Sequence, residues 1–210
     1  MTELEIKILL VKYFLEKYDN FVVSSEFPFQ FGERRADLAL LYSGYLTAFE
    51  IKGSRDKVSR LGYQVESYKK FFDFCYVVCE SSNLARVREV TPKGIGILIA
   101  DVDGIKHVRY SKLFKRHDKM MLISVLSVQK LNTLTKGKHL RSKHEICEHI
   151  SNNNSLDLIR EISRSDFNEK YGVASRLMKQ ETTLHLNSDD IYTITKKAPS
   201  LLKKRINRLS

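Results

Sequence analysis

Hydrophobic side chains recur every three or four positions over the first 18 residues of the chain. The positions that form this stripe are Leu4, Ile8, Val11, Leu15 and Tyr18. This spacing puts them on one face of an α-helix, and Asp19 and Asn20 follow as helix breakers. An amphipathic helix is therefore predicted at the start of the chain, followed by a short β-strand over residues 21–27.

Two apolar, β-prone runs, at residues 37–42 and 45–52, lie on either side of Ser43 and Gly44. A small polar residue followed by glycine between two such runs is typical of a β-hairpin turn. The segment is therefore predicted to form two antiparallel strands.

A helical period returns over residues 56–72 and is followed by a β-prone run around residues 76–78. Together with the hairpin, these segments predict a β-α-β crossover. A short helix is expected over residues 84–90, ahead of Pro92, and two more strands should flank a turn at residues 103–104. The order of elements predicts an α/β core with a mixed sheet and helices on both faces.

Beyond residue 110 the pattern becomes entirely helical. One helix is predicted over residues 119–131, and two more over residues 142–150 and 155–162, with residues 151–155 as a polar linker. The sequence thus predicts an α/β domain followed by an all-helical C-terminal extension.

The two halves of the sequence differ in charge. The chain has 36 Lys and Arg residues against 25 Asp and Glu, a formal net charge of +11, and 20 of the basic but only 10 of the acidic residues follow residue 110. Such an excess attracts a phosphate backbone, so nucleic acid is the favoured partner, although a merely solvated basic surface is the alternative. The basic residues predicted here to contact nucleic acid are Lys115, Arg116, Lys119, Lys136, Lys138 and Arg141.

Several classes of protein are disfavoured. No apolar run reaches the roughly 18 residues needed to span a bilayer, and the N-terminus lacks the features of a secretory signal, so a cytoplasmic protein with no membrane partner is expected. Cys75 and Cys79 lie too far apart along one predicted strand to form a disulfide and are predicted to be buried thiols. His144, Cys147 and His149 lack a fourth ligand for zinc and are predicted to lie on a helix.

The predicted hairpin brings two acidic residues together. With the turn at Ser43 and Gly44, Asp37 faces Glu50 across the strands, with Cβ atoms about 5 Å apart. Two carboxylates this close usually share a proton or a cation, and oxygen ligands suit Mg²⁺ or Mn²⁺ better than zinc. Lys52 lies on the same strand face as Glu50, an arrangement suited to phosphodiester hydrolysis.

A family resemblance rests on Asp37, Glu50, Ile51 and Lys52 in the hairpin and on Gln64 in the next helix. These residues, in this order, resemble the motif of the PD-(D/E)XK nuclease superfamily, which has the restriction-endonuclease-like fold. The chain is also similar to a group of small bacterial proteins in which a nuclease-like half precedes a basic helical half. The resemblance implies a nuclease-like domain over residues 1–110 and a basic, nucleic-acid-binding helical domain over residues 111–210.

The resemblance also implies a role for each motif residue. Asp37 and Glu50 would be metal ligands, and the carbonyl oxygen of Ile51 would be a third. Lys52 would be the catalytic lysine, and Gln64 would orient water or substrate. A structural ion-pair cluster on the sheet is the alternative for the charged residues, and an ordinary helix-surface position is the alternative for Gln64.

Four further positions matter to this resemblance. Glu5 on the first helix matches the acidic residue that many family members place in the outer shell of the metal. Arg35 and Arg55 are suited to phosphate contacts. Ala36 stands where the family has proline, which leaves the following ligand intact.

The function predicted from the sequence is a Mg²⁺- or Mn²⁺-dependent nuclease that hydrolyses DNA. One alternative is a non-catalytic nucleic-acid-binding or recruiting module on a nuclease-like scaffold. A ribonuclease is another, because the motif does not separate DNA from RNA. A homodimer or a protein partner is left open by the sequence.

Overall fold

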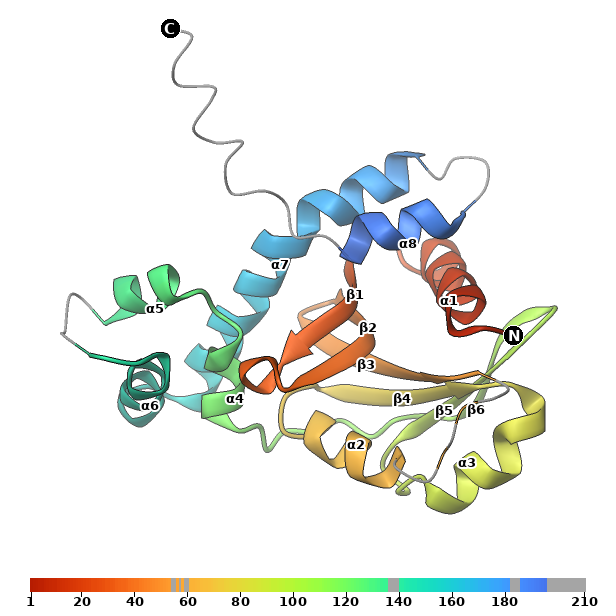
Figure 1. Ribbon diagram of the computed structural model, residues 1–210, viewed down its shortest axis with the longest axis horizontal. Helices are drawn as coiled ribbons and strands as arrows, with labels where there is room; N and C mark the ends of the chain where they lie inside the picture. The colour runs from red at the N-terminus through yellow and green to blue at the C-terminus, as the bar shows by residue number, and fades with distance from the viewer. Residues whose placement is uncertain (54–55, 57, 59–60, 136–139, 182–185, 196–210) are drawn as a thin grey trace, which may run out of the picture.

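The computed structural model describes residues 1–53, 56, 58, 61–135, 140–181 and 186–195. The described part of the chain forms a six-stranded mixed sheet with helices on both faces (Figure 1). The strands are β1 (Phe21–Phe29), β2 (Arg34–Tyr42), β3 (Tyr45–Lys52), β4 (Phe74–Cys79), β5 (Gly96–Asp101) and β6 (Gly104–Arg109). The helices are α1 (Glu3–Lys17), α2 (Leu61–Tyr68), α3 (Leu84–Val90), α4 (Lys119–Ser124), α5 (Val128–Leu134), α6 (Lys143–Asn153), α7 (Leu156–Glu181) and α8 (Ser188–Thr195).

The strands lie in the sheet in chain order, from β1 to β6. The β1–β2, β2–β3 and β5–β6 pairs are antiparallel, whereas β3–β4 and β4–β5 are parallel. The predicted hairpin is confirmed, because Tyr42 pairs with Tyr45 and both Ser43 and Gly44 have positive φ angles, as a tight hairpin turn requires. The crossover through α2 to the parallel strand β4 is confirmed as well.

The two faces of the sheet carry different helices. Helices α1 and α8 cover one face and α2 and α3 cover the other (Figure 1). On the α1 side the core includes Leu10, Phe14 and Leu38, and on the α2 side it includes Val65 and Phe72, all of them buried. The first helix is confirmed, but the stripe predicted for it is displaced. The face of α1 that is buried against the sheet carries Ile6, Leu10, Val11 and Phe14, and of the predicted stripe only Val11 is fully buried.

The helical half differs from the expectation in three places. The helix predicted over residues 119–131 is two helices, α4 and α5, because Ser127 is extended and caps α5 by accepting a hydrogen bond from the Lys130 amide at 3.2 Å. Helix α6 runs to Asn153, into the expected linker, and α7 continues 19 residues past Ile162. Helix α8 was not predicted.

Helix α7 joins the two halves of the chain. It packs along β1, an edge strand of the sheet, and Phe167 and Tyr171 contact the ring of Phe27. The hydroxyl of Ser175 accepts a hydrogen bond from the amide of Val23 at 2.9 Å and donates one to its carbonyl oxygen at 3.0 Å. The helix therefore supplies both the packing and the hydrogen bonds that this edge would otherwise lack.

A buried ion pair makes a second connection between the halves. Asp73, which precedes β4, accepts hydrogen bonds at Oδ2 from the Leu46 amide at 2.7 Å and from the Arg164 guanidinium of α7 at 2.9 Å. Both charged side chains are almost completely buried. His117 lies beside them, with Nε2 3.7 Å from Asp73 Oδ1. The sheet and α7 thus share a polar centre within a common core.

None of the helices in the described residues combines the length and the apolar character needed to cross a bilayer.

The three cysteines, Cys75, Cys79 and Cys147, are free, buried thiols, and burial raises the pKa of both Cys79 and Cys147 to about 11. The prediction that Cys75 and Cys79 are buried thiols is confirmed.

Gly96 on β5 provides a stability prediction. A Cβ atom at this position would lie 2.3 Å from the ring of Tyr76 and 2.8 Å from the Ser111 amide. We expect Gly96→Ala to lower the free energy of unfolding by about 1–3 kcal/mol in urea titrations, because the ring and backbone must both move. Gly172→Ala on α7 is the matched control: its Cβ would meet only the flexible Asn168 and Arg176 side chains, so stability should stay level or rise by up to about 1 kcal/mol. Equal losses in the two variants would contradict the steric explanation.

Candidate functional site

A fork in the sheet positions the predicted acidic residues. Strand β2 pairs with β3 only as far as Leu38 opposite Phe49, and beyond this point β2 follows β1 while β3 continues beside β4 to Lys52. Asp37 lies at the point of divergence. Its Oδ2 atom accepts a hydrogen bond from the Ile51 amide at 2.6 Å, so the side chain continues the ladder where the backbone pairing ends.

Strand β1 contributes an acidic residue that the sequence analysis missed. Glu26 is opposite Asp37, because the flanking pairs are Ser25 with Leu38 and Phe27 with Ala36. Its φ angle of 54° lies in the left-handed region, which is uncommon for a residue other than glycine and often marks a functional position. Glu26, Asp37 and Glu50 therefore occupy successive strands along one line across the sheet.

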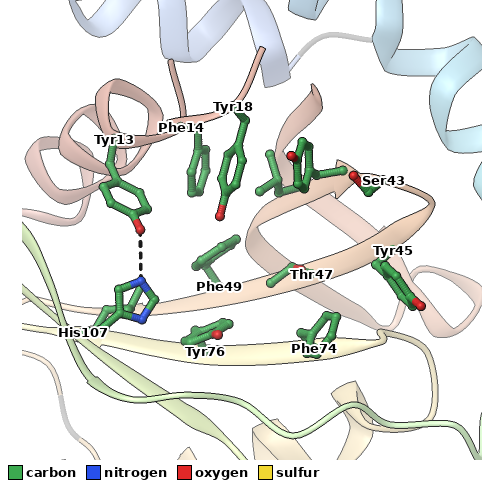
Figure 2. A pocket seen from close by; sticks show the side chains of 13 residues that line it. Tyr13, Phe14, Tyr18, Ser43, Tyr45, Thr47, Phe49, Phe74, Tyr76 and His107 are labelled. Carbon is green, nitrogen blue, oxygen red and sulfur yellow. Dashed lines mark hydrogen bonds between the residues drawn. The ribbon is translucent and has the colours of Figure 1, made fainter. Parts of the chain in front are cut away.

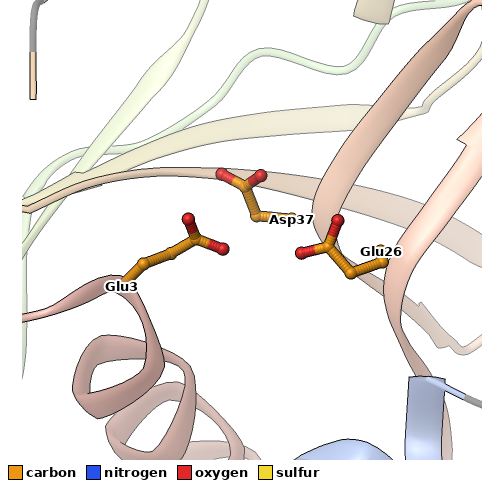
Figure 3. A group of neighbouring side chains, drawn as sticks. All are labelled: Glu3, Glu26 and Asp37. Atoms are coloured by element: carbon orange, nitrogen blue, oxygen red, sulfur yellow. The ribbon is translucent and has the colours of Figure 1, made fainter.

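Helix α1 places the carboxylate of Glu3 close to those of Glu26 and Asp37. Ligand atoms of Glu3, Glu26 and Asp37 all lie within 4.8 Å of one another, and the three side chains converge (Figure 3). Lys7, one turn after Glu3, forms ion pairs with both glutamates. We call Glu3, Glu26 and Asp37 the carboxylate cluster.

Glu3 belongs to the carboxylate cluster, whereas Glu5 does not. The Glu5 carboxylate instead accepts a hydrogen bond from the Thr2 amide at 2.7 Å, and the Thr2 hydroxyl accepts one from the Glu5 amide at 3.3 Å. This reciprocal pair is a helix N-terminal capping box, which turns Glu5 away from the sheet. Glu5 is therefore used in capping α1, and Glu3 is the acidic residue of this helix that lies near Asp37.

Glu50 and Lys52 share one face of β3, as predicted. The Lys52 ammonium donates to Glu50 Oε1 at 2.7 Å, and the Tyr68 hydroxyl of α2 donates to Oε2 at 2.5 Å. The Arg35 carbonyl oxygen also lies 3.0 Å from this hydroxyl, as an alternative acceptor for its single proton. Burial and the charge of Glu50 raise the pKa of Tyr68 well above its usual value, so the phenol stays protonated and remains a donor. Glu50 is thus held rigidly at the edge of the fork.

The electrostatics of Asp37 distinguish it from its neighbours. Lys7, Arg35 and Lys52 pair with Glu3, Glu26 or Glu50, whereas Asp37 forms no ion pair with any described residue. Burial and the nearby charge of Glu50 raise the pKa of Asp37 well above its usual value, although the Ile51 amide opposes the shift. A carboxylate in this position needs either a proton or a cation.

The donor set fits a hard divalent cation. Carboxylate oxygens from α1, β1 and β2 converge, and Glu50 lies close enough for its charge to affect Asp37. Oxygen ligands of this kind suit Mg²⁺ or Mn²⁺. The Ile51 amide points at Asp37, and the assignment of the Ile51 carbonyl oxygen as a ligand stays a prediction.

Gln64, Arg35 and Arg55 are the other residues predicted for the site in the α/β half. Gln64 is half-buried on α2, one turn before Tyr68, and its backbone carbonyl accepts a hydrogen bond from the Ser67 hydroxyl. Arg35 is exposed and contacts Glu26 at 3.3 Å. Arg55 lies outside the described residues. The structure thus brings Asp37, Glu50 and Lys52 together, and the role of the Gln64 side chain stays a prediction.

The basic residues predicted in the helical half differ in their surroundings. Lys115, Arg116 and Arg141 are exposed, whereas Lys136 and Lys138 lie outside the described residues. The Lys119 ammonium donates to the carbonyl oxygens of Ser151 at 3.1 Å and Asn154 at 2.8 Å, near the C-terminal end of α6. Lys119 therefore has a structural role in holding α4 against α6.

Comparison with known proteins places this architecture in a family. The family model described as Bacteriophage P4 protein cII matches residues 1–194. The chain belongs to the phage P4 cII family. Protein cII of Enterobacteria phage P4 is 24% identical over 221 residues, and the match covers 100% of this chain and 81% of the phage protein. A solved structure of a protein of unknown function from Silicibacter pomeroyi aligns with 67% of this chain and 92% of its own at 20% identity, with a TM-score of 0.41.

The match to the cII family spans both halves of the chain. Residues 1–194 contain the carboxylate cluster, the Asp73–Arg164 pair and almost all of α8. The family match therefore covers the sheet together with most of the helical half.

Proposed function

We propose that this protein is a metal-dependent nuclease that hydrolyses phosphodiester bonds of DNA. The observation that carries the proposal is the fork between β2 and β3, where Asp37 lies against the Ile51 amide and next to Glu50, with Lys52 on the same strand. We further propose that the sheet with α1 and α2 is a restriction-endonuclease-like core. The order of helix, hairpin, helix and parallel strand supports this assignment.

The proposed mechanism assigns a task to each side chain. Asp37 and Glu50 would hold Mg²⁺ or Mn²⁺, with Glu3 or Glu26 supporting it from the other side of the carboxylate cluster. The metal would polarise the phosphodiester and lower the pKa of a bound water. Lys52 would exchange its contact with Glu50 for the phosphate and stabilise the negative charge that develops there. Tyr68 would keep Glu50 in place by its hydrogen bond.

The basic helical half would hold the DNA backbone in this proposal. Lys115, Arg116 and Arg141 are exposed cations after residue 110 and are suited to such contacts, as is Arg35 beside the carboxylate cluster. Backbone contacts of this kind position a strand without reading its sequence, and they are compatible with RNA as well as DNA.

A specific observation also favours a second candidate, a nucleic-acid-binding module that does not cleave. Both oxygens of Glu50 already have partners, Lys52 and Tyr68, and the Lys52 side chain is only 12% exposed. If no metal replaces these partners, Glu50 and Lys52 form an ion pair whose role is purely structural. The two candidates differ in whether any substrate is cut.

A cleavage assay tests the proposal. Purified protein is incubated with plasmid, linear duplex, single-stranded and branched DNA and with RNA, in Mg²⁺, Mn²⁺ or EDTA. We expect cleavage of DNA that requires the metal and falls at least about 100-fold in Lys52→Ala, because the charge developing on the phosphate loses its partner. Lys106→Ala, which removes an exposed lysine from β6, is the matched control and should cleave like the wild type. Binding without cleavage by the wild-type protein on every substrate would reject the nuclease and support the second candidate.

A further inference from the structure

An aromatic pocket lies between the C-terminal end of α1 and the sheet, with a volume of about 250 Å³. Tyr13, Phe14 and Tyr18 form its upper wall, and Phe49, Phe74 and Tyr76 form its lower wall (Figure 2). Its mouth carries Tyr42 and Tyr45, which are 39% and 47% exposed. The pocket and the carboxylate cluster lie at opposite ends of α1, about 15 Å apart by the helical rise from Glu3 to Tyr13.

The size and lining of the aromatic pocket suit one flat ring system. Pockets for drug-sized ligands measure roughly 300–1,000 Å³, so this one is matched to a smaller group. Phe49 and Tyr76 stack nearly parallel, with an interplanar angle of 15°, and offer a flat surface on the lower wall. Aromatic walls on both sides favour a planar ligand that stacks over a bulky aliphatic one.

His107 adds a directional polar group to this lining. The Lys17 ammonium can only donate its hydrogen bond to the Tyr13 hydroxyl, so that hydroxyl directs its own proton to His107 Nε2, 3.0 Å away. Burial, helped by the charge of Lys17, lowers the pKa of His107, so the ring is neutral and carries its proton on Nδ1. This Nδ1–H group is buried and has no hydrogen-bond partner among the described residues. Because Nδ1 has almost no accessible surface, an acceptor on the edge of a bound ring would satisfy it once the His107 ring turns toward the pocket.

The positive charge near the aromatic pocket favours a ligand that carries an anionic group. Lys17 is exposed and lies beside Tyr13, in reach of an anionic group attached to a bound ring. The whole chain carries a net charge of +11. The side chains of phenylalanine and tryptophan lack a ring acceptor, whereas a nucleobase has carbonyl oxygens and ring nitrogens on its edge and a phosphate nearby.

We propose that the aromatic pocket binds a single unpaired nucleobase, stacked against the aromatic wall at Tyr76 and accepting a hydrogen bond from His107 Nδ1. Lys17 contacts the adjoining phosphate. The base comes either from a free nucleotide or from a single strand. The proposal does not depend on cleavage at the carboxylate cluster, so it stands or falls separately from the nuclease.

Fluorescence of 2-aminopurine tests the proposal in EDTA, where no metal-dependent cleavage occurs. The chain has no tryptophan, so the probe can be excited without protein background. A strand of abasic residues with one central 2-aminopurine and a fully paired duplex that contains one 2-aminopurine are titrated with full-length protein, and the fully abasic strand and deoxyadenosine monophosphate are tested as competitors. We expect quenching of the single strand, at least tenfold weaker binding of the abasic strand, and no quenching in the duplex.

Variants locate the bound base. Thr47→Phe fills the aromatic pocket from a half-buried position and should bring the affinity of the 2-aminopurine strand down to that of the abasic strand. His107→Phe keeps the ring and removes the donor, and should weaken binding about tenfold. Tyr192→Ala on α8 removes an exposed tyrosine that does not line the pocket and should bind like the wild type.

Competition by the mononucleotide would assign the site to free nucleotides, and its failure alongside quenching would assign it to strands. Equal binding of the base-containing and abasic strands, or wild-type binding by a folded Thr47→Phe protein, would overturn the proposal.

Discussion

Asp37→Asn is expected to abolish metal-dependent cleavage and yet leave the protein at least as stable as the wild type. Asparagine keeps an oxygen that can accept the Ile51 hydrogen bond, so the geometry of the fork should survive. It removes the negative charge that burial and Glu50 make unfavourable. We expect cleavage to fall by about 1,000-fold, because the metal loses a charged ligand, and the free energy of unfolding to rise by about 1 kcal/mol.

Cleavage rates and thermal unfolding with and without Mg²⁺ measure both effects. In EDTA, the melting temperature of Asp37→Asn should exceed that of the wild type by about 2–4 °C. Mg²⁺ should raise the melting temperature of the wild-type protein but not of the variant, because only the wild type binds it tightly. Glu5→Gln, which changes a carboxylate of the N-terminal capping box, should keep wild-type cleavage. An Asp37→Asn protein that is destabilised and still cleaves would show that Asp37 is a structural residue.

The second large effect is expected at the junction of the two halves. Arg164→Met keeps the length of the side chain on α7 and leaves the buried carboxylate of Asp73 without its ion-pair partner. We expect a loss of about 3–5 kcal/mol in the free energy of unfolding, most of it from the uncompensated charge. The corresponding fall in melting temperature is about 6–20 °C.

Two further variants separate the charge from the packing. Adding Asp73→Asn to Arg164→Met should restore at least about 1 kcal/mol, because a neutral amide still accepts from the Leu46 amide and is cheaper to bury. Arg176→Met changes an exposed arginine of the same helix and should stay within about 0.5 kcal/mol of the wild type. A double variant no more stable than Arg164→Met alone would show that lost packing dominates.

The pH dependence of the stability of Arg164→Met gives an independent check. Burial, helped by the Arg164 guanidinium, lowers the pKa of His117, which lies beside Asp73. Without that guanidinium the pKa of His117 rises, so the folded variant takes up a proton at a higher pH than the wild type does. By linkage, protonation of His117 then stabilises the folded variant more than it stabilises the folded wild type. The loss in free energy of unfolding caused by Arg164→Met should therefore become smaller as the pH falls through the range where His117 titrates.

The helices and strands of the α/β half could be predicted because each is short and is marked by residues close to it in the sequence. The hairpin turn at Ser43 and Gly44 sets the register of β2 against β3, and this register alone is enough to put Asp37 beside Glu50. The helical half was harder, because Ser127 interrupts an apolar stripe without breaking its period and only its cap reveals the end of one helix and the start of the next. The length of α7 depends on packing against β1, which lies far away in the sequence.

The candidate site was predicted in part for the same reason. Asp37, Glu50 and Lys52 are neighbours within one hairpin, so local pairing rules place them. Glu26 and Glu3 join them through tertiary packing of β1 and α1, although a charged residue within the predicted strand was a signal for Glu26. Glu5 was named from the resemblance alone, and the sequence does not show that its carboxylate is used in the capping box of α1.

The hydrogen bonds between Ser175 and Val23 have a consequence for the synthesis of this protein. The two residues are 152 positions apart. At about 5–20 residues per second, roughly 8–30 s pass between the emergence of β1 from the ribosome and the emergence of the helix that covers it. During this time the edge strand is open to pairing with other chains, so a cell making the protein rapidly would be exposed to aggregation of nascent chains even though the finished molecule has a protected edge.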